Sequence, residues 1–201
     1  MQPTDNQPVS LWLNDFDKNG TPEQILCRYN GGESLPIVLR HDLVATLPFL
    51  KKKYLAYKNY VGQKVSDIFT KEQLEGAIEL KAFSFSSSVL LSQADGRFEL
   101  KSLPVEAQFS PIYGLAAADF DGDGKKDLLE GGNFSRCKPE MGTFDADYGL
   151  FLKGDGRGGF QSVRHPASGF QLDGEVRDIK LVGSKIVVAR NDQTPLVFQL
   201  K

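Results

Sequence analysis

The interpretation of this chain starts from nine residues near its middle, Asp119-Phe120-Asp121-Gly122-Asp123-Gly124-Lys125-Lys126-Asp127. Side-chain carboxylates stand at positions 1, 3, 5 and 9, and a backbone carbonyl at position 7 completes the set: Asp119, Asp121, Asp123, Asp127 and, through its carbonyl, Lys125. Ca²⁺ takes about six to eight oxygen ligands, which alternate residues of a short loop can supply. Gly122 and Gly124 allow the positive φ angles of a tight loop. Because four crowded carboxylates repel one another unless a divalent cation lies between them, the stretch predicts a calcium-binding loop.

The same pattern occurs earlier in the chain, at an offset of 104 residues (119 − 15). The corresponding oxygen donors are Asp15, Asp17, Asn19, the backbone carbonyl of Thr21, and Glu23. This first loop has a neutral amide in place of one carboxylate and a longer acid at the last position. Since ligand charge tunes the affinity of such loops, we expect it to bind Ca²⁺ more weakly than the second loop.

The second loop also satisfies the EF-hand pattern, because Glu130 stands at its twelfth position. An EF-hand needs a helix on each side of the loop. Pro111 and Gly114 precede the loop, and Gly131 and Gly132 follow Glu130, all of which oppose a helix. We therefore reject an EF-hand.

Two further stretches, 89–98 and 149–160, share a short apolar run, a Gly/Asp turn and a phenylalanine, which predicts a β-hairpin in each. Four short strands with an acidic loop after the first form one repeat unit, a pattern typical of a propeller blade. The strands expected in the second unit are 113–120, 127–131, 148–152 and 159–164. Those of a third unit, which has no acidic loop, are 176–182, 185–190 and 196–200.

The first unit is interrupted between about residues 40 and 80, where the apolar period changes from two to about three and a half. Five residues step by 3, 4, 3 and 4, which places them on one helical face: Leu47, Leu50, Tyr54, Tyr57 and Val61. Thr70 followed by Gln73 indicates a capping box that opens a second helix, with Leu74, Ala77 and Ile78 inward. The fold class expected is mainly β, with two to three propeller-type blades and a two-helix insertion in the first. The domain limits expected are 8–103, 104–170 and 171–201.

Composition narrows the functional classes. The formal net charge of −2 gives no electrostatic footprint for nucleic acid. The chain shows neither an apolar run long enough to span a membrane nor a secretory signal at its start. Cys27 and Cys137 are most simply two free, partly buried cysteines, and a bridge between them is the alternative. No nucleophile motif of a hydrolase is present, so an enzyme is not expected.

On the Asp-Phe-Asp-x-Asp-Gly-x-x-Asp core and the Gly-Asp-Gly-x-Gly-Gly-Phe turn, the chain resembles the FG-GAP/VCBS repeats found in integrin α-subunit propellers. It is most similar to bacterial cartilage-acidic-protein-like proteins, over residues 11–201. The resemblance implies structural Ca²⁺ in both loops, joining the first and second strands of each blade.

The resemblance also implies a secreted, periplasmic or surface-attached protein that acts by binding a protein or a glycan. Because two or three blades are too few to close a propeller, the exposed strand edges are expected to pair with missing blades or with another chain. The alternative is part of a carbohydrate-active propeller enzyme, in which acids such as Asp145 and Asp147 would serve.

Overall fold

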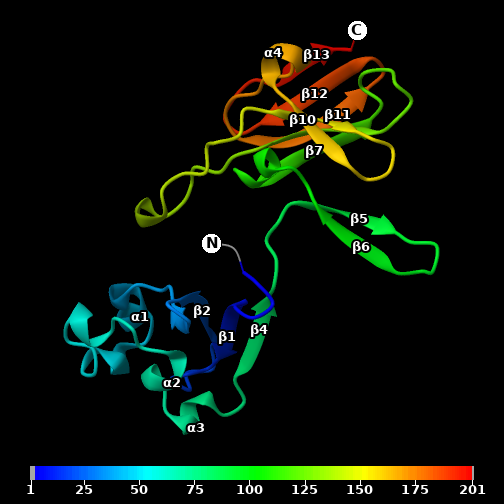
Figure 1. Cartoon of the computed structure of the whole chain (residues 1–201). Coiled ribbons are helices and arrows are strands. Elements are labelled where there is room, and N and C mark those ends of the chain that lie inside the picture. Colours follow the sequence, from blue (N-terminus) through cyan, green and yellow to red (C-terminus); the bar gives the residue numbers. More distant parts are fainter. Residues whose placement is uncertain (1–2, 201) are drawn as a thin grey trace. The chain divides into compact units, whose positions relative to one another are not determined.

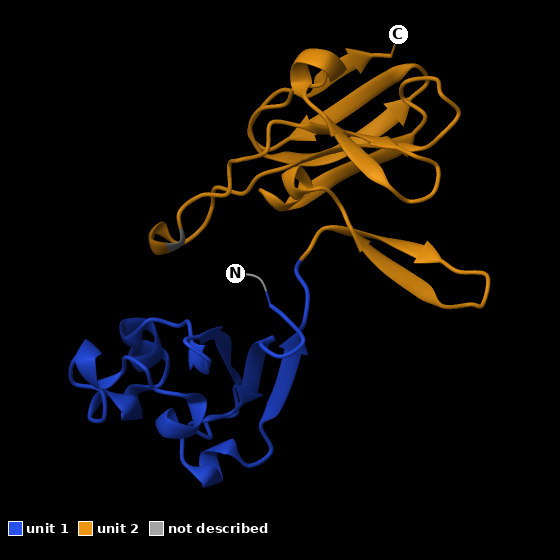
Figure 2. Ribbon diagram, in the orientation of Figure 1, with its two compact units in different colours: residues 1–85 blue, residues 86–201 orange. Residues whose placement is uncertain are grey.

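The computed structural model describes residues 3–200, with the side chain of Met141 excepted. The chain is mainly β and divides into two compact units, Met1–Phe85 and Ser86–Lys201 (Figure 2). Antiparallel sheets make up both units, which confirms the expected fold class at this coarse level. The predicted limits at 103/104 and 170/171 stay predictions, because a compact unit can hold more than one repeat.

Unit 1 is built on a four-stranded antiparallel sheet in the order β3-β2-β1-β4 (Figure 1). Its strands are β1 Val9–Asn14, β2 Glu23–Asn30, β3 Glu33–Pro36 and β4 Ile78–Ala82. Alternate residues of β2 are buried, and Ile25 and Cys27 belong to the core of the unit. The ring of Phe16, which follows β1, stacks on that of Phe69 with 4.0 Å between centroids. The sheet therefore positions the first acidic loop directly over a packed core.

The segment between β3 and β4 is helical, as predicted, but it is not two helices. It consists of short turns: α1 Arg40–Thr46, η1 Pro48–Lys51, η2 Tyr57–Asn59, α2 Val65–Ile68 and α3 Lys71–Leu74. The predicted continuous helical face from Leu47 to Val61 is wrong, because Pro48 cannot continue α1 and opens a separate 3₁₀ turn. Leu47, Leu50 and Tyr54 are buried as expected, whereas Tyr57 and Val61 are exposed.

The capping box at Thr70 is confirmed, with Gln73 N donating to Thr70 Oγ1 and Thr70 N donating to Gln73 Oε1. The helix that it opens lasts only one turn. Ile78 was predicted to point inward from this helix, but it begins β4 and is exposed. The chain returns to the extended conformation at this point, and β4 pairs with the free edge of β1.

Unit 2 contains a four-stranded antiparallel sheet whose strands follow one another in sequence order, β10-β9-β8-β7. They are β7 Ile112–Ala118, β8 Asp127–Gly132, β9 Leu150–Gly154 and β10 Phe160–Val163, each within two residues of its predicted bounds. A three-stranded sheet follows, with β11 Val176–Val182, β12 Lys185–Arg190 and β13 Leu196–Gln199. Short turns connect these strands: η3 Val105–Gln108, η4 Pro139–Met141 and α4 His165–Ser168.

Every residue of β8 is buried, because this strand is covered on both faces of its sheet. Leu129 packs into a core with residues of β11 and β12, and Leu128 packs on the opposite face into a second core with Leu152. Gly114 and Gly131, which are cross-strand partners, let β11 lie close to the sheet. A Cβ at Gly114 would lie 2.9 Å from Ile179 Cγ1, and one at Gly131 would lie 2.8 Å from Leu172 Cδ1. The four-stranded and three-stranded sheets of unit 2 are therefore stacked face to face.

The predicted hairpin at 89–98 is present as β5 Ser88–Ser92 and β6 Phe98–Ser102. It was assigned to the end of the first repeat, but it forms a two-stranded sheet of its own and belongs to unit 2. The hairpin packs on unit 2 through two residues of β5. Val89 contacts the core around Leu128, and Leu91 lies where a side chain at Gly158 would clash with it.

Cys27 and Cys137 are both free, so the disulfide that was the alternative is not formed. Burial raises the pKa of the Cys27 thiol to about 12, which keeps it protonated as a small apolar core residue. Among residues 3–200, no helix is both long enough and apolar enough to cross a bilayer.

Candidate metal centres

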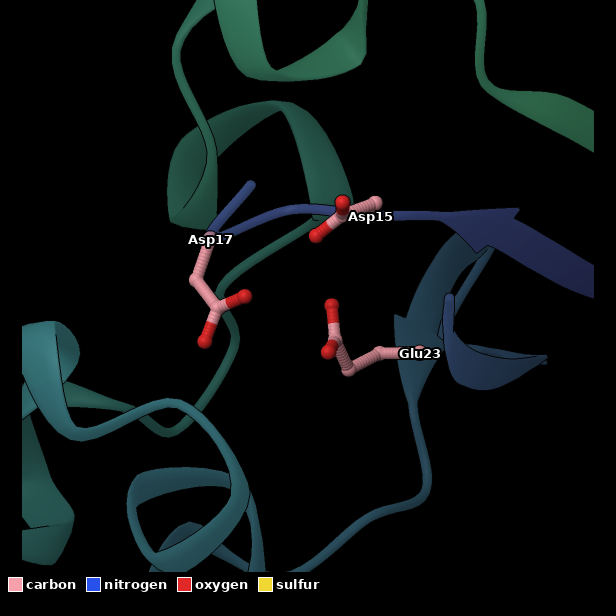
Figure 3. Close-up of side chains that lie close together, drawn as sticks. All are labelled: Asp15, Asp17 and Glu23. Atoms are coloured by element: carbon pink, nitrogen blue, oxygen red, sulfur yellow. The ribbon is translucent and has the colours of Figure 1, made fainter. Parts of the chain in front are cut away.

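The first acidic loop gathers three carboxylates from the end of β1, the loop itself and the start of β2. Figure 3 shows the side chains of Asp15, Asp17 and Glu23 pointing toward a common space. One oxygen from each lies within 4.8 Å of the others. Glu23 is buried, and one of its oxygens accepts a hydrogen bond from Phe16 N. This donor set consists of hard oxygens, which is the chemistry that Ca²⁺ prefers.

The second loop gathers its carboxylates in the same way. Asp119, Asp121 and Asp127 each offer an oxygen atom within 4.8 Å of the other two. Asp127 is fully buried at the start of β8. Its Oδ2 accepts from Phe120 N at 3.0 Å, and its Oδ1 accepts from Gly154 N at 2.8 Å. One carboxylate thus fixes the loop to its own start and to β9.

The two loops share five hydrogen bonds from backbone N–H groups to loop side chains, at the same positions. The first carboxylate accepts from backbone N–H groups four and five residues on: Asp15 from Asn19 and Gly20, and Asp119 from Asp123 and Gly124. The third loop residue accepts from the fifth, and the fifth from the seventh, at 2.8–3.2 Å in both loops. The last carboxylate accepts from the second residue, as Phe16 N donates to Glu23 Oε2 at 2.9 Å.

The backbone of the two loops also has the same sign of φ at the fourth and sixth positions. These are Gly122 (φ 79°) and Gly124 (φ 82°) in the second loop, and Lys18 (φ 60°) and Gly20 (φ 91°) in the first. The predicted positive φ at Gly122 and Gly124 is confirmed. A lysine at φ 60° is uncommon, so the loop conformation is held at Lys18 against its local preference. The two loops therefore match in backbone conformation as well as in sequence, including at Lys18, where the second loop has a glycine.

The fifth position differs from the expectation of a fourth carboxylate ligand. Asp123 is not a member of the close group of three. Its Oδ2 lies 3.0 Å from Lys153 Nζ and 3.5 Å from Lys125 Nζ. Lys153, on β9, also pairs with Asp121 Oδ2. The hydrogen bond from Lys153, together with the N–H of Lys125, holds the pKa of Asp123 below its usual range. The second loop is thus partly neutralised by ammonium groups, and Lys153 reaches it from a distant part of the sequence.

Of the side chains predicted as ligands, three carboxylates converge in each loop. The remaining two, Asn19 and Asp123, instead accept a hydrogen bond from the backbone N–H two residues on. Coordination by the carbonyls of Thr21 and Lys125 remains a prediction.

Strands flank the second loop on both sides, β7 before it and β8 after it, which confirms the rejection of an EF-hand. Glu130 lies within β8, only 2% exposed, and its Oε2 has no hydrogen-bond partner. Burial, and then the negative charge of Asp147, raise the pKa of Glu130 to about 8. Burial also raises the pKa of Asp147. These two acids were not predicted as a pair.

A buried asparagine organises the loops at the far end of β8. Asn133 Nδ2 donates to the carbonyls of Asp147 at 2.7 Å and Gly174 at 3.1 Å, and its Oδ1 accepts from Asp147 N at 3.0 Å. Nearby, Glu175 accepts hydrogen bonds from Ser135, Asn191 and Arg177. These bonds lower the pKa of Glu175 to about 2, and those from the side chains of Ser135 and Asn191 contribute most. This network links the end of β8 to the start of β11, and so the four-stranded sheet to the three-stranded one.

No protein-family model, no curated protein and no solved structure matches this chain.

Proposed function

We propose that the chain is a calcium-stabilised binding module built from FG-GAP/VCBS-type propeller blades. The observation that carries this proposal is the repeated loop. Two segments 104 residues apart share five hydrogen bonds from backbone N–H groups to loop side chains and the same positive φ positions, and three carboxylates converge in each. Two unrelated acidic turns would not be expected to share these hydrogen bonds and φ angles, whereas two copies of one ion-binding loop would.

The blade assignment is supported by the sheet that carries the second loop. Strands β7 to β10 are consecutive and antiparallel, and the sheet has a hydrophobic core on each face. Propeller blades are four-stranded sheets that pack against neighbours on both faces. The loop joins the first and second strands of this sheet, which is the position that the FG-GAP resemblance implies.

Calcium in this module would be structural. A divalent ion would neutralise the three converging carboxylates and hold β1 to β2 in one unit and β7 to β8 in the other. An ion that binds the folded state and not the unfolded state raises stability by mass action, about 2.7 kcal/mol at a free concentration of one hundred times Kd.

The direct test is thermal unfolding of the chain in EDTA and in millimolar Ca²⁺. We expect the melting temperature to rise by several degrees with Ca²⁺ and to rise less with Mg²⁺, which requires a more rigid octahedral site. Asp15→Asn with Asp17→Asn would remove the response of unit 1, and Asp119→Asn with Asp121→Asn that of unit 2. Identical melting temperatures in EDTA and Ca²⁺, after complete removal of bound ions, would refute the proposal.

The location and partner follow from the same proposal. Loops of this kind in extracellular modules bind Ca²⁺ at about 10⁻⁴–10⁻³ M, a concentration found outside the cytoplasm. We therefore propose an extracytoplasmic module that binds a protein or a glycan, with unpaired strand edges available to further blades or to another chain. Retention of the chain on immobilised glycans or surface proteins, lost in EDTA, would test the binding role. The carbohydrate-active enzyme remains the alternative, and hydrolysis of a glycan panel would favour it.

A further inference from the structure

The second acidic loop contains an ammonium group that the first loop lacks. Lys153 Nζ lies 3.0 Å from Asp123 Oδ2 and pairs with Asp121 Oδ2, one of the three converging carboxylates. Within residues 3–200, no lysine or arginine forms an ion pair with Asp15, Asp17 or Glu23. The two loops are therefore alike in backbone but different in their internal counter-charge.

The position of Lys153 is set by the fold rather than by its flexible side chain alone. The next residue, Gly154, ends β9 and donates its N–H to Asp127 Oδ1 at 2.8 Å. A Cβ at Gly154 would lie 2.0 Å from the carbonyl oxygen of Lys126, so only glycine lets β9 lie this close to the loop. The pair Lys153-Gly154 thus binds the loop twice, through an N–H to the buried carboxylate and an ammonium to the exposed ones.

This inference rests on the calcium site proposed above. We propose that Lys153 is the residue that sets the calcium affinity of the second loop. Without an ion, its ammonium neutralises Asp121 and Asp123 and keeps the loop closed. A cation that binds Asp121 competes with this ammonium for the same carboxylate. The second loop then binds Ca²⁺ more weakly than the first, although it has more carboxylates.

The sign of this effect follows from electrostatics. Lys153 and Ca²⁺ repel each other, and the ion pair that the ammonium makes with Asp121 is lost when the ion takes that carboxylate. The side chain of Lys153 is 41% exposed, so solvent weakens both terms. A change of about tenfold in affinity is the expected scale for one such charge near a divalent site.

The test uses isothermal titration calorimetry with CaCl₂ as the titrant. In the full chain carrying Asp15→Asn and Asp17→Asn, only the second loop can bind, and we compare Lys153 with Lys153→Met. We expect Lys153→Met to bind Ca²⁺ about tenfold more tightly and to melt several degrees lower in EDTA. Lys185→Met, an exposed lysine of β12 with the same change in net charge, should leave both quantities within error. Lys153→Gln serves as a second variant should the methionine impair folding.

The possible outcomes separate this inference from the proposed function. Binding with the same affinity in Lys153 and Lys153→Met proteins would overturn the inference and leave calcium binding standing. No binding in either protein, together with no binding to the first loop in an Asp119→Asn, Asp121→Asn chain, would overturn both. Tighter binding in Lys153→Met alone, with a lower melting temperature in EDTA, would support the inference.

Discussion

At the scale of single residues, Asp127 combines a structural role with membership of the proposed metal site. It is fully buried, it belongs to the converging group, and it accepts two backbone hydrogen bonds, from Phe120 N and Gly154 N. Asp127→Ala would leave both donors without their acceptor. An unsatisfied buried group costs about 1–3 kcal/mol, so we expect a loss of about 2–4 kcal/mol in the free energy of unfolding in EDTA.

Asp121→Ala is the matched control for this prediction, since Asp121 is exposed and accepts within the loop from Asp123 N and pairs with Lys153. We expect it to change stability in EDTA by less than Asp127→Ala does, while it abolishes the response of unit 2 to Ca²⁺. Urea unfolding of both variants with and without Ca²⁺ separates the two roles. Equal losses in EDTA would mean that Asp127 acts only through the ion.

Glu130 makes stability depend on pH in a direction opposite to that of most carboxylates. Its pKa is raised to about 8 by burial and by Asp147, so the folded state retains a proton that the unfolded state releases. The favourable contribution is complete below the unfolded pKa, near 4.5, and is lost as pH rises through 8. We expect the free energy of unfolding to fall by up to about 1.4 kcal/mol per pH unit over this window.

Glu130→Gln tests this dependence, because the amide has the same shape and does not titrate. Urea unfolding at pH 5, 6, 7 and 8 should give a clearly flatter profile for the variant than for the unsubstituted chain. Parallel profiles would show that Glu130 is ionised in the folded protein.

The sequence pointed to the carboxylates of the site but not to its lysine. Asp15, Asp17 and Glu23 lie within nine residues of each other, so local spacing alone indicates that they converge. Lys153 lies 32 residues from Asp121, and only the pairing of β8 with β9 brings them together. A lysine directly before the Gly-Asp-Gly turn was a visible signal, although nothing local shows which loop it faces.

At the scale of elements, the close approach of β11 to the β7–β8 pair depends on two glycines. A Cβ at Gly114 would lie 2.9 Å from both Ile179 Cγ1 and Val176 Cγ1, and 3.2 Å from the backbone of Asp178. Overpacking of this kind costs about 1–3 kcal/mol. We expect Gly114→Ala to lower the free energy of unfolding of unit 2 by this amount, measured by urea unfolding in Ca²⁺.

Gly183→Asn provides the comparison, because this turn glycine between β11 and β12 has a φ of 61° and open space around its Cα. Asparagine tolerates that backbone region, so the change should be small. If Gly114→Ala lowered the free energy of unfolding as little as Gly183→Asn, the four-stranded and three-stranded sheets of unit 2 could move apart without cost.

Strands were easier to predict than helices in this chain, for a physical reason. The Gly/Asp turns between strands are local signals, and the strands of unit 2 follow them. The spacing from Leu47 to Val61 imitates one helix, but only Leu47, Leu50 and Tyr54 of this series reach the core, from the short turns around α1 and η1. Tyr57 and Val61 are exposed. Pro48 was the local evidence against continuity.

At the scale of the whole chain, the sheet orders could not be predicted. In unit 2 the strands pair in sequence order, whereas in unit 1 β4 crosses to the free edge of β1 after the helical insertion. The edge that β4 chooses depends on long-range packing of the inserted turns. The hairpin β5–β6 likewise joins unit 2 through Val89, a contact that no local pattern encodes.

The proposed calcium binding would change the charge of the whole chain. The formal net charge is −2 at pH 7, so the ion-free chain should migrate slowly toward the anode in native electrophoresis. Each bound Ca²⁺ would add two positive charges, so bound ions would slow the migration toward the anode and, with both loops occupied, reverse it. We expect reversal in saturating Ca²⁺, in two steps, because the role proposed for Lys153 weakens one of the two sites. The Asp119→Asn, Asp121→Asn chain lacks two carboxylates and should shift toward the cathode in a single step at low Ca²⁺. Migration that stays unchanged in Ca²⁺, with bound ions first removed, would contradict occupancy of either loop.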